Sequence, residues 1–217
     1  MEKMLNTKEL IASDLLSIGA VFLRPLEPFH WASGIVSPIY CDNRLTLSYP
    51  TVRDHVEHAL AELIRTHYPD CEAVMGTSTA GIAHAAIVAT ILDLPMGYVR
   101  ASAKDHGRAN QIEGKCEPGT KVVVIEDLIS TAGSCVDVCE ALRENGAIVL
   151  GIASIFTYGM KKAEDRLKEH DLVNVSCSDY DTMLEIAVQK GIIQASQIPA
   201  LLSFRNNPSD ESWREGL

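Results

Sequence analysis

The 217-residue sequence lacks the patterns that mark three specialised classes of protein. No apolar run approaches the roughly 20 residues that a membrane-spanning helix needs, so we expect no contact with a membrane. The first ten residues are polar and charged, and we expect no signal peptide. None of the six cysteines forms a Cys-x-x-Cys pair, which argues against a zinc ribbon or a disulfide framework. These absences predict a reduced, cytoplasmic setting.

Positive charge is also scarce in this chain. Aspartate and glutamate number 29 against 19 lysines and arginines, which gives a formal net charge of −10 at pH 7. Such a surface disfavours general binding to nucleic acid or to anionic membranes. It still permits a site for a small anionic substrate, because that site needs only local cations.

The order of the expected elements indicates the fold class. Short apolar strands alternate with helical patterns, and we find no internal repeat or linker. The expected strands are residues 73–76, 96–99, 121–125, 148–156 and 172–176. The expected helices are residues 8–21, 52–67, 81–92, 134–145, 160–170, 179–189 and 195–202. This alternation predicts an α/β fold with a doubly wound, mostly parallel sheet in a single domain.

The two ends of the chain differ from this regular middle. Residues 22–43 are rich in proline, glycine and aromatic side chains, and we expect extended strands and turns that form a hood over the site. We therefore divide the chain into residues 1–50, with the first helix and the hood, and residues 51–217, with the α/β core. The tail from Asn206 is polar, and we expect its end to be frayed.

The most informative stretch runs from Val122 to Ser134. Four apolar residues predict a buried strand, Glu126 and Asp127 stand at its carboxyl end, and a small hydroxyl-rich loop leads into a helix. Ligands of open parallel sheets bind at the carboxyl ends of the strands, and a helix that begins there offers free N–H groups to a phosphate. Acids beside such a loop suit sugar hydroxyls or a phosphate-bound cation. The alternative is an ordinary strand–turn–helix, but two uncompensated carboxylates beside a buried strand are costly.

Three further segments carry candidate binding residues. Residues 98–114 contain four potential cations, which suit a diphosphate leaving group, although a solvated loop is the alternative. Residues 29–44 contain Trp31 and Tyr40, a platform for a flat heterocycle, and Arg44, which is available for a carboxylate; a structural hairpin is the alternative. Residues 76–81 form a small-residue loop whose amides could bind a diphosphate, unless it is only a tight turn.

The stretch from Val122 to Ser134 resembles the 5-phosphoribosyl 1-diphosphate (PRPP) motif of the type I phosphoribosyltransferases, and no Gly-Lys-Ser/Thr follows as in a P-loop. The resemblance implies that family's fold, with the 5′-phosphate on residues 130–134 and the ribose hydroxyls on the acid pair. It implies Mg²⁺ as a cofactor, held mainly by PRPP and water rather than directly by the protein. The implied PRPP contacts are Thr77, Ser78, Arg100, Lys104, His106, Glu126, Asp127, Leu128, Ile129, Ser130, Thr131, Ala132, Gly133 and Ser134.

Within that family the chain is most similar to the orotate phosphoribosyltransferases. The pattern Arg100-x-x-x-Lys104-x-His106-Gly107 resembles their catalytic loop, and residues 29–40 resemble their orotate-binding segment. The resemblance implies a homodimer in which this loop reaches the partner's active site. The implied catalytic residues are Lys104, Asp105, His106, Glu126 and Asp127. The implied orotate contacts are Ser130, Trp31 and Tyr40, with Arg44 as our candidate for the substrate's negative charge.

Ala32, Ala80 and Ala101 stand where many or some family members have lysine. The expected activity is transfer of ribose 5-phosphate from PRPP to orotate in pyrimidine nucleotide synthesis. A purine phosphoribosyltransferase of the same fold and a PRPP-sensing regulator without catalysis are the alternatives. The cationic loop and the aromatic segment argue against the purine enzyme, and the cationic loop and the net charge of −10 argue against a regulator that binds nucleic acid.

Overall fold

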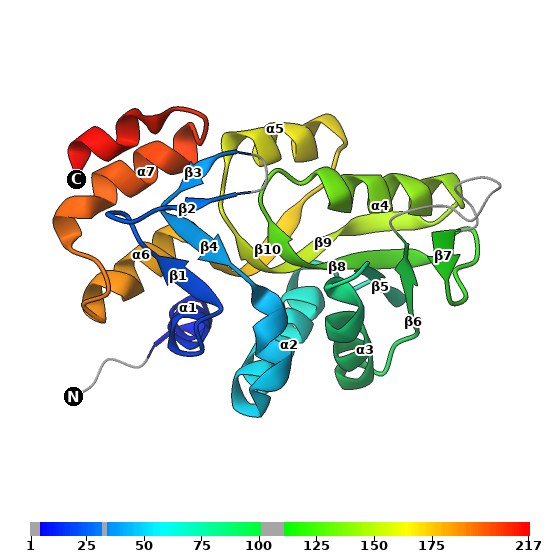
Figure 1. The fold of residues 1–217 in the computed structure, drawn as a ribbon. Coiled ribbons are helices and arrows are strands. Elements are labelled where there is room, and N and C mark those ends of the chain that lie inside the picture. The colour runs from blue at the N-terminus through cyan, green and yellow to red at the C-terminus, as the bar shows by residue number, and fades with distance from the viewer. Residues whose placement is uncertain (1–4, 32–33, 101–110) are drawn as a thin grey trace.

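A six-stranded sheet forms the centre of the molecule (Figure 1). The computed structural model describes residues 5–31, 34–100 and 111–217. The strand order is β10-β9-β8-β5-β6-β7, and every pair is parallel except the edge pair β6–β7. These strands are β5 (Ala73–Thr77), β6 (Met96–Val99), β7 (Ile112–Glu113), β8 (Lys121–Ile129), β9 (Ile148–Thr157) and β10 (Asn174–Asp179). The predicted fold class, a doubly wound and mostly parallel sheet, is confirmed.

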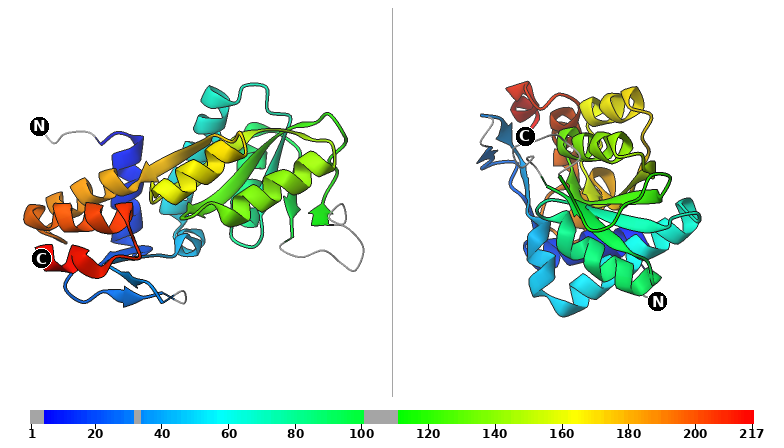
Figure 2. Two further views of the ribbon diagram at one scale, coloured as in Figure 1. Left: turned by 90° about the horizontal axis from the view of Figure 1, so that it is seen from above. Right: turned by 90° about the vertical axis from the view of Figure 1, so that its right-hand side faces the viewer.

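Helices cover both faces of this sheet, as the two orientations in Figures 1 and 2 show. One layer contains α2 (Pro50–His67) and α3 (Gly81–Leu92), and the other contains α4 (Gly133–Glu144) and α5 (Lys161–Glu169). Side chains of a strand alternate between faces, so Val74 and Val123 pack with α2 and α3, while Met75 and Val124 pack with α4 and α5. Strands buried on both faces explain the continuous apolar runs in the sequence.

The two ends of the chain meet beside the sheet, where the N-terminal segment that contains the hood packs with the C-terminal helices. The N-terminal elements are α1 (Thr7–Ser17), β1 (Val21–Leu23), β2 (Phe29–His30), β3 (Val36–Ser37), β4 (Ile39–Cys41) and η1 (Asn43–Ser48). The C-terminal elements are α6 (Tyr180–Gln189), η3 (Ala195–Gln197), α7 (Ile198–Asn206) and η4 (Glu211–Gly216). One apolar core runs through both groups and into the sheet. The division of the chain at residue 50 stays a prediction.

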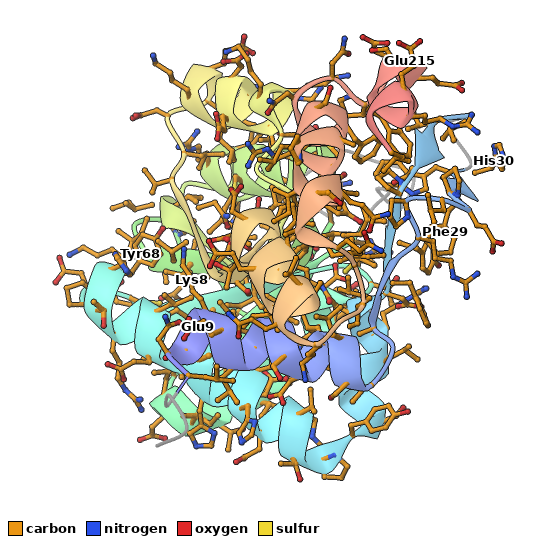
Figure 3. The ribbon with its side chains drawn as sticks, turned by 90° about the vertical axis from the view of Figure 1, so that its left-hand side faces the viewer. Lys8, Glu9, Phe29, His30, Tyr68 and Glu215 are labelled. Atoms are coloured by element: carbon orange, nitrogen blue, oxygen red, sulfur yellow. The ribbon has the colours of Figure 1, made fainter. Side chains whose placement is uncertain are left out.

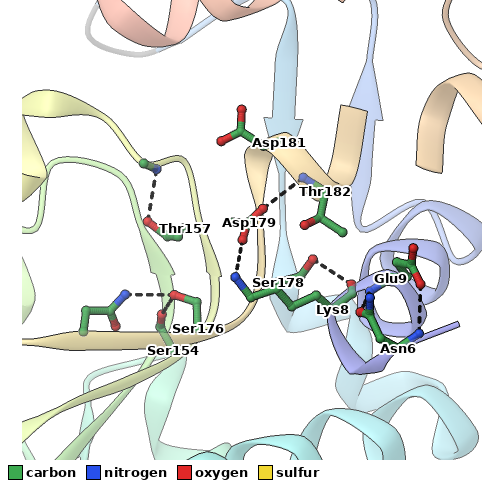
Figure 4. A network of polar contacts seen from close by, with 12 residues as sticks. Asn6, Lys8, Glu9, Ser154, Thr157, Ser176, Ser178, Asp179, Asp181 and Thr182 are labelled. Atoms are coloured by element: carbon green, nitrogen blue, oxygen red, sulfur yellow. Dashed lines mark hydrogen bonds and ion pairs between the residues drawn. The ribbon is translucent and has the colours of Figure 1, made fainter. Parts of the chain in front are cut away.

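Polar contacts fasten the first helix to the end of β10 (Figure 4). Lys8 Nζ lies 2.6 Å from Asp179 Oδ2, and the Ser178 hydroxyl donates to the Lys8 carbonyl at 2.9 Å. Asp179 also accepts a hydrogen bond from the Thr182 backbone N–H at 2.9 Å, so it caps α6 as well. Figure 3 shows Lys8 and Glu9 near the beginning of α1, on the side where α1 crosses α6. These contacts join the N-terminal segment to the core.

The predicted helix 8–21 already ends at Ser17, and two further differences from the sequence predictions concern the strand of the acid pair and the C-terminal tail. Strand β8 continues to Ile129 rather than ending at residue 125, because the long neighbouring strand β9 pairs with it as far as Thr157. The expectation of a frayed tail is wrong for the turn η4. Trp213 is 2% exposed there and packs edge to face on Phe204, with ring centroids 5.8 Å apart. No helix in the described part of the chain is long and apolar enough to cross a membrane.

We expect Trp213→Ala to lower the free energy of unfolding by about 3–5 kcal/mol, because it removes a buried aromatic side chain and leaves a cavity. Urea unfolding followed by circular dichroism measures the change. Arg214→Ala, next to it on the same turn and exposed, is the control and should change stability little. An unchanged unfolding midpoint in Trp213→Ala would show that the tail does not stabilise the fold.

Candidate active site

The candidate site lies at the carboxyl edge of the sheet, where neighbouring strands differ in length. The last paired residues of β5 and β8 are Gly76 and Ile125. Beyond that point β8 pairs with β9 alone, with Glu126 opposite Ser154. On the side that faced β5, strand β8 therefore has no neighbouring strand at the acid pair. This arrangement places both acids beside the loop that follows β5.

Hydrogen bonds hold the backbone of the acid pair at this end of β8. Glu126 is 5% exposed, and its Oε1 accepts the backbone N–H of Asp127 at 2.9 Å. The Asn43 side chain, itself buried, donates from Nδ2 to the Asp127 carbonyl at 2.7 Å. Burial, together with the neighbouring Asp127, raises the pKa of Glu126 to about 8. Because a nearby positive charge would favour ionisation of this carboxyl, the pair suits a cationic or metal-bearing ligand.

The loop of residues 77–80 approaches β8 closely because glycines stand at both of its ends. A Cβ at Gly81 would lie 2.6 Å from Thr77 Oγ1, and a Cβ at Gly76 would lie 2.8 Å from the Gly81 carbonyl oxygen. The Thr77 hydroxyl donates to the Ile125 carbonyl at 3.2 Å, and the Ser78 hydroxyl donates to the Val99 carbonyl at 2.7 Å. The Ser78–Thr79 peptide bond is cis. The loop thus bridges β6 and β8 across the end of β5.

A polar pocket of about 330 Å³ lies between this loop and the beginning of α4. Of the predicted PRPP contacts, Thr77, Ser78, Arg100 and Ser134 line it. Arg100 follows β6, and its Nε lies 3.2 Å from Glu113 Oε1 on β7. The first backbone N–H groups of α4 have no partner within the helix, so the helix start can bind an anion.

The loop between β8 and α4 contains three further predicted PRPP contacts, Ser130, Thr131 and Ala132. Ile129 ends β8 and is buried, and Ser130 follows it. Ala132 has φ 59°, in the left-handed region, and α4 begins at Gly133 rather than at residue 134. The Thr131 carbonyl accepts a hydrogen bond from Arg166 of α5 at 3.0 Å.

An aromatic pocket of about 280 Å³ lies on the hood side of the acid pair. Its lining residues are His30, Trp31, Tyr40, Cys41, Leu128, Ser130 and Tyr158. The rings of Trp31 and Tyr158 are 5.8 Å apart, and Trp31 Nε1 donates to the Ile39 carbonyl at 3.2 Å. The structure therefore brings together Trp31, Tyr40 and Ser130, the residues predicted to contact orotate. Leu128, predicted as a PRPP contact, lines the same pocket.

Arg44 does not join them. Its Nε lies 2.6 Å from Asp42 Oδ1, its side chain is exposed, and it does not line the aromatic pocket. Its role toward orotate stays a prediction. Lys104, Asp105 and His106 lie outside the described residues, as do Ala32 and Ala101. Within the described ranges, no group of three or more His, Cys, Asp or Glu side chains gathers to hold a metal ion.

Three residues of the site were not identified from the sequence. Tyr158 follows the carboxyl end of β9, so the rule that located the acid pair could also have found it. Asn43 stands next to the predicted Arg44, but its bond to Asp127 spans 84 positions and has no local signal. Arg166 stands in a strongly charged helix, whose pattern is typical of a solvated surface, yet it is half-buried against residues 131–133.

The fold and this site define a type I phosphoribosyltransferase. Residues 47–189 match the phosphoribosyl transferase domain. The UMP synthase of Leishmania donovani shares the fold, with a TM-score of 0.78 and 24% identity over 92% of this chain and 42% of that chain.

Relatives of higher sequence identity show which family within this class the chain belongs to. The sequence is 56% identical to an orotate phosphoribosyltransferase of Bacillus anthracis over 206 residues, or 95% of this chain and 98% of that protein. The orotate phosphoribosyltransferase of Aeropyrum pernix has a TM-score of 0.72 and 32% identity, over 81% of this chain and 96% of that chain. The chain therefore belongs to the orotate phosphoribosyltransferase family.

The raised pKa of Glu126 predicts a pH dependence of stability. Between its ordinary value of 4.5 and about 8, the folded state keeps a proton that the unfolded state has released. Stability should therefore fall as the pH rises through this window, by at most about 1.4 kcal/mol per pH unit from this group. Glu126→Gln cannot ionise and should be relatively more stable at pH 8 than at pH 5.

Urea unfolding of both proteins from pH 5 to 9, without ligands, measures this difference. The buried Glu57 also has a raised pKa through burial, but its contribution is common to both proteins and cancels in the comparison. A stability difference that stays constant across the range would contradict the assignment.

Proposed function

We propose that this chain transfers ribose 5-phosphate from PRPP to orotate and releases diphosphate, which gives orotidine 5′-monophosphate for pyrimidine nucleotide synthesis. The observation that supports it best is that the strand and loop of the acid pair contribute to two different pockets, Ser134 to the polar one and Leu128 and Ser130 to the aromatic one. A phosphorylated sugar suits the first pocket, and a flat heterocycle suits the second. In this proposal the anomeric carbon lies between the two ligand groups, close to Glu126 and Asp127.

The chemistry is a displacement at the anomeric carbon. The bond from C1 to the diphosphate oxygen breaks with its electron pair on the diphosphate, and orotate N1 bonds to C1 after losing its proton. Positive charge develops on the ribose, and the carboxylates of the acid pair would stabilise it. No protein nucleophile is required, so catalysis consists of positioning and electrostatic stabilisation.

The leaving group needs positive charge in the same site. Arg100 lines the polar pocket, and the proposal adds Lys104 and His106, with Asp105 between them, from a loop of the partner subunit in a homodimer. The oxygen donors of the acid pair fit a magnesium ion that is held largely by substrate and water. When bound, Mg²⁺ would neutralise diphosphate charge.

The first test is the loss of orotate absorbance with purified protein, PRPP and Mg²⁺, with adenine, guanine, hypoxanthine and uracil in parallel. We expect consumption of orotate alone, and only with the metal present. Turnover of a purine instead would move the function to a purine phosphoribosyltransferase. PRPP binding without turnover of any base would indicate a regulator.

Asp127→Asn should lower kcat on the order of 10²-fold or more, because it removes charge stabilisation at the reacting carbon. Its effect on the urea unfolding midpoint should be small, since the side chain is half-buried and the two residues have similar volume. Asp70→Asn is the matched control, since Asp70 is exposed and pairs with Lys121 at the surface. Unchanged turnover in Asp127→Asn would show that Asp127 does not stabilise charge at the reacting carbon.

Sharing of the loop across a dimer predicts complementation between two inactive variants. A heterodimer of Lys104→Ala and Asp127→Asn chains has one site with an intact acid pair and an intact loop, if the loop acts on the partner's site. Purification through two different tags, followed by the orotate assay, should recover about half of the unmodified dimer's activity. A heterodimer no more active than its parents would place the loop in its own subunit's site.

A further inference from the structure

Arg166 of α5 lies against the outside of the loop that connects β8 to α4. Its Nη1 donates to the Thr131 carbonyl at 3.0 Å. A Cβ on Gly133 would lie 2.8 Å from the same nitrogen, so the guanidinium rests directly on the first residue of α4. Arg166 is half-buried, whereas the charged residues beside it on α5 are exposed. Its position is thus fixed against the loop rather than free in solvent.

The charge of Arg166 is not matched by a carboxylate of its own. Among the described residues none forms an ion pair with it, although Lys161 on the same helix pairs with Asp165 and the nearby Arg143 pairs with Glu140. Asp137 and Glu140 line a cavity of about 440 Å³ together with Arg166, but they make no ion pair with it. The loop of residues 130–134 contains no lysine or arginine. Arg166 is therefore a cation available to an anion bound at this loop.

The hydrogen bond to Thr131 also orients the loop's backbone. A trans peptide is planar, with its C=O and N–H pointing in opposite directions. Because the Thr131 carbonyl faces Arg166, the N–H of Ala132 points to the other side, away from α5. Ala132 has the left-handed conformation, φ 59° and ψ 14°, in which successive N–H groups can converge on an anion. A charged donor that holds the Thr131 carbonyl stabilises this arrangement.

We propose that Arg166 is a positioning residue for the 5′-phosphate of the sugar substrate. It acts from outside the loop, by holding the backbone that binds the phosphate and by adding positive charge at the start of α4. The inference rests on the proposed function, in which residues 130–134 bind that phosphate. Arg166 would act on the 5′-phosphate alone, because the loop of residues 77–80 would hold the diphosphate of PRPP without help from Arg166.

Competitive inhibition by ribose 5-phosphate and by inorganic diphosphate, each against PRPP, distinguishes binding of the 5′-phosphate from binding of the diphosphate. Arg166→Gln should weaken inhibition by ribose 5-phosphate about tenfold and raise the KM for PRPP. The inhibition constant of diphosphate and kcat should change little. Arg166→Lys keeps the charge but lacks the planar fork, so it should give a smaller loss, and it carries the test if the glutamine variant does not fold. Lys162→Gln is the matched control on an exposed site of the same helix.

Two outcomes would overturn the inference while leaving the proposed function intact. An unchanged inhibition constant of ribose 5-phosphate in Arg166→Gln would show that Arg166 has no link to the phosphate-binding loop. An equal loss for ribose 5-phosphate and diphosphate would show a general structural effect. Failure of the unmodified protein to bind ribose 5-phosphate or to consume orotate would overturn the proposed function together with this inference.

Discussion

Beyond Ile125, strand β8 has a hydrogen-bonded neighbour on one side only, because β5 ends while β9 continues. The site depends on this difference in strand length. It lets Glu126 and Asp127 remain in a hydrogen-bonded strand at a point where the neighbouring strand β5 has already ended. The glycines at positions 76 and 81 then let the next loop close against this end of β8. Backbone geometry therefore sets the position of the acids independently of any bound ligand.

Charge is distributed unevenly around this end of the sheet. The chain has a net charge of −10, yet the proposed anion sites combine helix and loop N–H groups with Arg100 and, from behind, Arg166. The carboxyl of Glu126 is buried and has a raised pKa. Negative groups thus lie near the proposed reacting carbon, and positive groups lie where phosphates would bind. Local geometry, rather than net charge, decides which ligand an acidic protein accepts.

The aromatic pocket depends on both ends of the chain. Trp31 of the N-terminal segment packs edge to face on Phe204 of α7, which in turn packs on Trp213 of η4. Tyr158, at the end of β9, closes the other side of Trp31. A heterocycle platform near the beginning of the sequence is therefore supported by residues near its end. The C-terminal tail belongs to the architecture of the site, which explains why its one tryptophan is buried.

The sequence by itself determined the sheet, the acid pair and most of the proposed pocket, because their signals are local. An apolar strand followed by acids, a small hydroxyl loop and a helix is readable within residues 122–134. The contacts of Asn43, Arg166 and Trp213 were decided by tertiary structure alone. Each of these side chains meets a partner from another element, and nothing in its own neighbourhood distinguishes it from an ordinary surface residue. Packing gave them their partners, whereas Arg44 pairs with Asp42, only two residues before it, and does not line the aromatic pocket.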